Sequence, residues 1–181
     1  MKTRFKNIMS HIPLISNKTK LLISVSLVGI AFIAFCICPE RLDTQICLLA
    51  MFFSFLGDLS LNSMPLNKRP HWLLYIGAAF FMVAHLLYIA SYGIRIRESG
   101  AAFFNGGVIL VLLAMVLLYG YFIRLSITTD HKNVLPLIIV YIAVISADCM
   151  AVFSYAWSQG SSNPVAVLAA VGAVSFLLSD L

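Results

Sequence analysis

The sequence predicts an all-α fold, a polytopic transmembrane helical bundle. Of its 181 residues, 61% are hydrophobic and only 10% are charged, a composition typical of integral membrane proteins. A spanning helix needs about 20 apolar residues, and the chain supplies six such segments. Their bounds are near 21–38, 45–64, 71–92, 103–123, 134–157 and 164–181. We therefore expect six helices in one bundle over residues 21–181, preceded by a basic segment over residues 1–20.

The first apolar segment is expected to be a retained helix and not a cleaved signal peptide. Its run from Leu21 to Cys38 is longer than the roughly 7–15 residues of a signal core, and no Ala-x-Ala-like site follows it. In residues 1–20, apolar side chains recur at helical spacing among Lys and Arg. This pattern fits a short interfacial helix on an anionic leaflet, and it fits a solvated basic tail equally well.

The five segments that follow are long apolar runs, and four of them contain an Asp or His that stands out. These residues are Asp58 in 45–64, His85 in 71–92, Asp148 in 134–157 and Asp180 in 164–181. The segment 103–123 is apolar almost throughout. The last segment stops within an apolar run, with no C-terminal cap. We therefore expect the bundle to be incomplete at its C-terminal end.

The positive residues predict the orientation. Nine of the twelve Lys and Arg residues fall on one side of such a bundle, in the N-terminal segment and in the loops after the second and fourth helices. The other side has Arg41, Arg95 and Arg97. Because cytoplasmic loops are enriched in Lys and Arg, we expect a multi-pass protein of the cell (inner) membrane with a cytoplasmic N-terminus. The basic balance reflects these loops and does not indicate nucleic acid as a partner.

The intramembrane carboxylates are candidate functional groups, because a charged side chain at a helix centre costs roughly 2.5 kcal/mol or more. At 1.5 Å per residue, Asp58 and Asp180 fall at a similar depth towards the cytoplasmic side, and His85 and Asp148 form a second polar level. Simpler roles stay open. Asp58 can serve as a hydrogen-bonded link between helices, His85 as a packing residue and Asp148 as its structural partner.

Helical spacing adds further polar residues to the two levels. Ser54 and Asn62 share a face with Asp58 at i, i+4, i+8, and Tyr88 shares a face with His85. Metal chemistry is not indicated, since the other three histidines lie in tails or loops or at a helix end, whereas a metal site needs several converging ligands. We expect no metal ion and no cofactor.

Three motifs follow one another along the chain. They are Phe53-Ser54-Phe55-Leu56-Gly57-Asp58, then Ile76-Gly77-Ala78-Ala79-Phe80 leading to Ala84-His85-Leu86-Leu87-Tyr88-Ile89, and finally Gly172 to Asp180 with Ser179-Asp180 at its end. Together and in this order they resemble the motifs of the YhhN/lysoplasmalogenase family. The resemblance implies a membrane hydrolase that cleaves the vinyl-ether bond of lysoplasmalogens, with Asp58 and Asp180 as the catalytic pair. Family members usually have about eight helices, and this chain begins near what looks like their second.

Vinyl-ether hydrolysis fits a carboxyl pair, since it needs an acid to protonate the β-carbon and an anion to stabilise the oxocarbenium ion. Two carboxyls in one site push their pKa values apart, so that one stays protonated while the other is charged. Around this pair we expect residues that bind or position the substrate, a lysophospholipid or ether lipid. These are Ser54, Asn62, His85, Tyr88, Asp148 and Ser179.

Two other functions remain open. Asp and His residues within membrane helices are typical of proton-coupled transporters, although no convincing internal repeat is found. The third possibility is a lipid-binding membrane scaffold without enzymatic activity.

Overall fold

A computed structural model describes residues 17–62, 71–115, 135–160 and 163–180, and within these ranges the side chains of residues 17, 18, 71, 135, 138 and 177–180 lie outside the described part. The described residues form six helices and no strand. The helices are α2 (Asn17–Ile37), α3 (Leu42–Asn62), α4 (His71–Glu98), the short helix Gly106–Met115, α6 (Leu135–Gln159) and α7 (Pro164–Asp180). The all-α fold is therefore confirmed. Residues 1–16, most of the basic N-terminal segment, lie outside the described residues.

Four of the described helices are long and apolar enough to span a membrane. The spans are Thr19–Ile37, Leu42–Asn62, Trp72–Glu98 and Ile139–Gln159. Large apolar side chains such as Leu22, Phe32 and Leu168 are exposed on the outside of the helices, a surface suited to contact with lipid tails and not with water. The chain is thus a multi-pass helical membrane protein.

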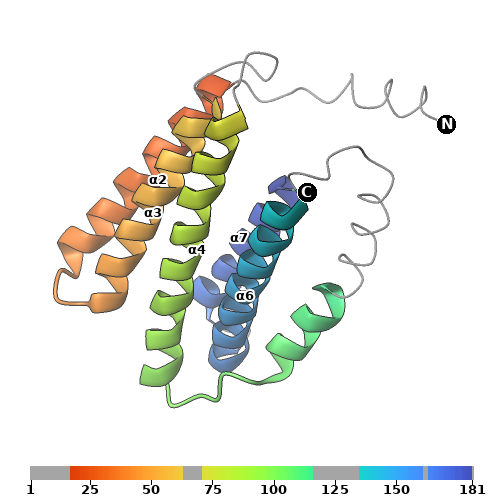
Figure 1. Cartoon of the computed structure of the whole chain (residues 1–181). Coiled ribbons are helices and arrows are strands. Elements are labelled where there is room, and N and C mark those ends of the chain that lie inside the picture. The colour runs from red at the N-terminus through yellow and green to blue at the C-terminus, as the bar shows by residue number, and fades with distance from the viewer. Residues whose placement is uncertain (1–16, 63–70, 116–134, 161–162, 181) are drawn as a thin grey trace.

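The helices run alternately up and down (Figure 1). One end of the bundle, here the upper end, holds the start of α2, the end of α3 and the start of α4; the lower end holds the α2–α3 and α6–α7 connections. Close backbone packing joins α2 to α3, α3 to α4, α4 to α6 and α6 to α7. Because the short helix Gly106–Met115 separates them in the chain, α4 and α6 both run downward (Figure 1).

Two glycines allow α3 and α4 to pack closely. A Cβ atom on Gly57 would lie 2.8 Å from Phe81 Cδ2, and one on Gly77 would lie 2.7 Å from Leu61 Cδ2. Both distances are shorter than van der Waals contact. Small residues at helix interfaces in membranes permit this approach, and here it brings the polar residues of α3 next to those of α4.

The ends of the helices are set by recognisable caps. Asn163 Oδ1 accepts hydrogen bonds from the backbone N–H groups of Val165 (3.0 Å) and Ala166 (3.3 Å) at the start of α7. At the end of α4, Gly100 adopts a φ of 68°, a conformation that glycine tolerates best. The next N–H, of Ala101, then closes the last turn onto the carbonyl of Ile96 at 3.3 Å.

The third segment is longer than the sequence predicts. The apolar run suggests an end near residue 92, whereas α4 continues to Glu98. The extra turn carries Arg95, whose Nε donates to Asp43 Oδ2 of α3 at 2.8 Å. The helix therefore continues because its charged turn has a partner on the neighbouring helix.

Candidate functional site

His85 of α4 and Asp148 of α6 form a buried pair near the middle of the bundle. Their Nδ1 and Oδ2 atoms are 2.7 Å apart, and the two residues are only 3% and 8% exposed. The carboxylate partner favours a proton on Nδ1 and leaves Nε2 for another contact. Both Nε2 of His85 and Oδ1 of Asp148 are buried without a hydrogen-bond partner among the described residues. The pair predicted to share one polar level is in direct contact.

Aromatic rings surround the His85 imidazole. Its centroid lies 4.8 Å from that of Phe176 on α7, 6.3 Å from that of Tyr88 and 6.4 Å from that of Tyr141. The Tyr88 side chain also lies close to Ser54 of α3. His85 and its neighbours thus connect α3, α4, α6 and α7 at one depth.

Asp58 of α3 lies in a second group of contacts, shared with α2. Ser24 Oγ is hydrogen-bonded to Asp58 Oδ2, and the Asp58 side chain is half-buried. Asn62 donates from Nδ2 to the backbone carbonyl of Asp58 at 2.9 Å. Asp58 and Asn62 were predictable from the sequence, whereas Ser24 was not, because its only signal is a hydroxyl that it shares with Ser26 in the same apolar run.

The other carboxylate of the predicted pair, Asp180, is the last residue of α7. Its side chain and that of Ser179 lie outside the described residues, so the pairing of Asp180 with Asp58 and the role of Ser179 beside the substrate stay predictions. Phe81 of α4 contacts both α3, which bears Asp58, and α7, which bears Asp180. Its ring lies against Gly57 on α3 and 6.1 Å from the Phe176 ring on α7, centroid to centroid. Phe176 lies one helical turn before Asp180, and Gly57 lies one residue before Asp58. The aromatic contact is therefore close in sequence to both carboxylates.

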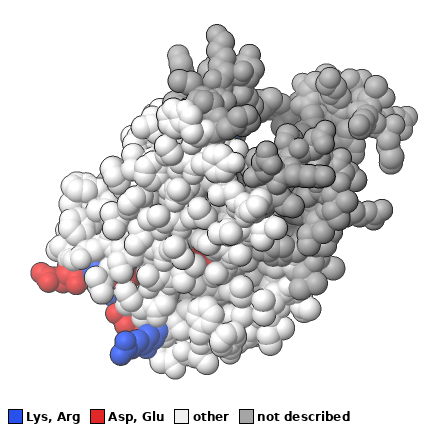
Figure 2. Space-filling model, in the orientation of Figure 1, with Lys and Arg blue, Asp and Glu red and all other residues white. Residues whose placement is uncertain are grey.

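A charged cluster at the lower end was not anticipated. Asp43, only 2% exposed, accepts hydrogen bonds from Arg41 Nε (2.9 Å) and Arg95 Nε (2.8 Å). Arg41 Nη2 also donates to Glu98 Oε2 at 3.0 Å. The hydrogen bond to Asp43 raises the pKa of Arg41 above its ordinary value. In the sequence analysis, Arg41 and Arg95 served only to predict orientation. The Arg-x-Asp spacing at the start of α3 was the available sign that these charges could pair. Figure 2 shows that the charged side chains on this face gather mainly at the lower end.

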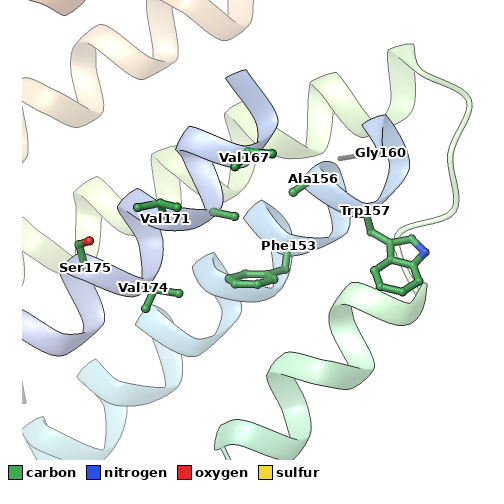
Figure 3. A pocket seen from close by; sticks show the side chains of 9 residues that line it. Phe153, Ala156, Trp157, Gly160, Val167, Val171, Val174 and Ser175 are labelled. Carbon is green, nitrogen blue, oxygen red and sulfur yellow. The ribbon is translucent and has the colours of Figure 1, made fainter. Parts of the chain in front are cut away.

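A separate groove lies between α6 and α7 (Figure 3). It has a volume of about 690 Å³, and the side chains of Phe153, Trp157 and Val171 contribute to its lining. None of its nine lining residues is titratable. The groove therefore offers apolar contact but no group for proton transfer.

Within the described part of the chain, no three His, Cys, Asp or Glu side chains lie close enough together to hold a metal ion. The polar groups that lie together around Asp58 and around His85 are carboxylates, one imidazole, hydroxyls and the Asn62 amide. Such groups are suited to acid–base chemistry and to proton transfer.

No curated protein and no solved structure matches the chain. The model of one family, described as the YhhN family, matches residues 18–181. This range includes all six described helices except the first residue of α2. The chain therefore belongs to the YhhN family.

Proposed function

We propose that this protein is an integral membrane hydrolase that cleaves the vinyl-ether bond of lysoplasmalogens. The products would be a fatty aldehyde and a glycerophospho-base. The observation that carries the proposal is the position of Asp58 in a chain of the YhhN family: a half-buried carboxylate within an apolar helix, hydrogen-bonded to a second helix through Ser24. Such a costly group is expected where it has a function.

The reaction needs one proton and one water molecule. Protonation of the β-carbon of the vinyl ether gives an oxocarbenium ion. Water adds to the cationic carbon and releases a proton, and the resulting hemiacetal breaks its C–O bond to give aldehyde and alcohol. A hydroxyl donor stabilises a carboxylate, so the Ser24 contact suits Asp58 as the anion that faces the oxocarbenium. Asp180 is then the acid.

The His85–Asp148 pair supports the same proposal from the next level of the bundle. His85 Nε2 is buried without a described partner, and Asp148 fixes the ring orientation through Nδ1. An imidazole held in this way can position the attacking water or accept its proton. Tyr88, which lies close to Ser54, completes the group of side chains proposed to position the substrate.

The proposal is tested by measuring aldehyde release from purified protein in lipid nanodiscs. The substrates are the alkenyl, alkyl and acyl forms of one lysophosphatidylethanolamine. Only the alkenyl form has a β-carbon that can be protonated, so aldehyde should form from it alone. Absence of aldehyde from all three with folded protein would refute the hydrolase.

A second candidate, proton-coupled transport, is favoured by one specific observation. The buried His85–Asp148 contact lies next to the level of Asp58, and Asp and His chains in membrane helices carry protons in transporters. Proteoliposomes with an internal pH dye would show proton uptake that depends on Asp148. Aldehyde release without such uptake favours the hydrolase.

A further inference from the structure

The charged cluster at the lower end borders a cleft of about 790 Å³. Arg41, Asp43, Arg95 and Glu98 line its polar side. Its apolar lining includes Ala31 and Ile37 of α2 and Val165 of α7. The cleft is thus amphipathic, because charged and apolar side chains both line it.

Arg95 has hydrogen-bond donors to spare in this cleft. Its Nε donates to Asp43 Oδ2 at 2.8 Å. Among the described residues, its two terminal nitrogens have no recorded hydrogen-bond partner. Its side chain is 27% exposed. A guanidinium presents a planar fork of N–H groups that matches the oxygens of a phosphate.

The Arg95 guanidinium is held in place from two directions. The buried carboxylate of Asp43 binds its Nε, and its Cζ lies 5.9 Å from the ring centroids of both Tyr92 and Tyr155. The two rings are themselves 5.7 Å apart. Fixing a binding group before the ligand arrives lowers the entropy lost on binding.

The formal charges along the cleft balance, with two guanidiniums and two carboxylates among its lining residues. A cleft of this kind suits a zwitterionic head group better than a bare anion, because the phosphate can bind Arg95 while an ammonium lies near Glu98. The cluster also lies where the spans end, at Ile37 and Glu98, the depth at which lipid head groups meet a membrane protein.

We infer that this cleft binds the head group of a zwitterionic lysophospholipid, with the phosphate on Arg95 and the acyl chain along α2 and α7. The site goes beyond the proposed hydrolysis. Asp43 precedes Asp58 by fifteen residues of α3, about 22 Å along the helix, so a lipid bound at Arg95 keeps its glycerol away from Asp58.

The test uses native mass spectrometry of the detergent-solubilised protein with palmitoyl lysophosphatidylethanolamine. This probe has no vinyl ether, so its binding is measured whether or not the protein is a hydrolase. Arg95→Gln should weaken binding by about tenfold or more, since a hydrogen bond to a charged group is worth roughly 1.5–3 kcal/mol. Arg95→Lys keeps the charge beside Asp43 and should restore binding only in part, because the planar fork is lost.

Arg97→Gln is the matched control, since Arg97 lies on the same turn of α4 and is exposed but is not part of the cleft lining. Equal binding by wild type and Arg95→Gln, or an equal loss in Arg97→Gln, would overturn the site. So would equal binding of monopalmitoylglycerol, which has no phosphate. Displacement of the lipid by millimolar inorganic phosphate would assign the site to free phosphate and overturn the lipid assignment.

In Glu98→Gln, the preference for lysophosphatidylethanolamine over lysophosphatidic acid should fall; an unchanged preference would contradict the ammonium contact.

Discussion

At the scale of single residues, Asp58 and the His85–Asp148 pair are held in different ways. Asp58 is half-buried and hydrogen-bonded to Ser24 on a peripheral helix. His85 and Asp148 are enclosed between α4 and α6, and each keeps one polar atom without a described partner. A half-buried carboxylate can be reached by a lipid, whereas the enclosed pair is reached only through the bundle. This difference suits Asp58 to contact with substrate and the pair to positioning.

Asp58→Asn and Asp180→Asn should each lower aldehyde release by at least about 100-fold, the lower range for positioned acid–base catalysis. The double variant should be hardly worse than the weaker single one, because groups that act as a unit are not additive. Undiminished turnover in either single variant, at equal expression and folding, would eliminate the carboxylate pair.

Ser24→Ala should lower turnover by roughly tenfold, because it removes a hydrogen bond to a charged group. Ser26→Ala provides the control. Ser26 lies on the same helix, but its hydroxyl bonds the carbonyl of Leu22 at 2.9 Å and is exposed. Equal activities of the two variants would show that the Ser24 contact does not support catalysis.

Asp148→Leu should destabilise the protein by about 1–3 kcal/mol, since it leaves the buried imidazole of His85 without its partner. The double variant His85→Phe with Asp148→Leu should be less destabilised than the two single effects predict together, because it leaves no unpaired polar group. Thermal unfolding in detergent measures all three variants. Strict additivity would contradict a direct energetic coupling.

At the scale of helices, the α3–α4 contact is the one most sensitive to side-chain size. Gly57 lies against the Phe81 ring and Gly77 against Leu61. Phe81 in turn contacts Phe176, so a change at Gly57 also acts on α7. Phe81 of α4 therefore packs against both of the helices that bear Asp58 and Asp180.

Gly57→Ala should destabilise the protein by about 1–3 kcal/mol, the usual range for overpacking. Gly93→Ala is a suitable comparison, because a Cβ atom there meets nothing within 4 Å and alanine favours the helix. The melting temperature in detergent should fall for the first variant and stay equal or rise for the second. A similar fall in both would mean that close helix approach is not what Gly57 provides.

At the scale of the whole molecule, the charge bias predicts that the lower end faces away from the cytoplasm. In a protein whose native cysteines have been replaced, Ser99→Cys should react with an impermeant maleimide in intact cells, and Lys20→Cys only after permeabilisation. Both positions are exposed. The reverse pattern would invert the orientation.

Much of the fold was predictable from the sequence, because long runs of apolar residues mark the helices directly. The six segments match the six described helices, with the main difference at the end of α4. That end was missed because Arg95 and Arg97 resemble loop residues when read alone. The turn stays helical where Arg95 pairs with Asp43 of another helix, a partner that periodicity does not reveal.

The candidate site was predictable in its residues and less so in its contacts. Asp58, His85 and Asp148 stand out because charge is costly within apolar helices. His85 contacts Asp148 because α4 and α6 run parallel and pack side by side. The sequence predicted that the two residues lie at one depth in the membrane, but not that their helices are neighbours. Ser24 could not be distinguished from Ser26 by sequence, since only the rotation of α2 against α3 separates them.

The edge position of α2 has a consequence for how the protein works over time. Among the described helices, α3 is the one against which its backbone packs closely, and most of its apolar surface already faces outward. Its separation from α3 therefore exposes little new apolar area, and in a bilayer the lipid tails replace what is lost. Such an edge opens at lower free energy than the interior contacts of α4 and α6. The Ser24–Asp58 hydrogen bond opposes this separation, so under the proposed function its lifetime would limit how often Asp58 meets a lipid that diffuses in the plane of the membrane.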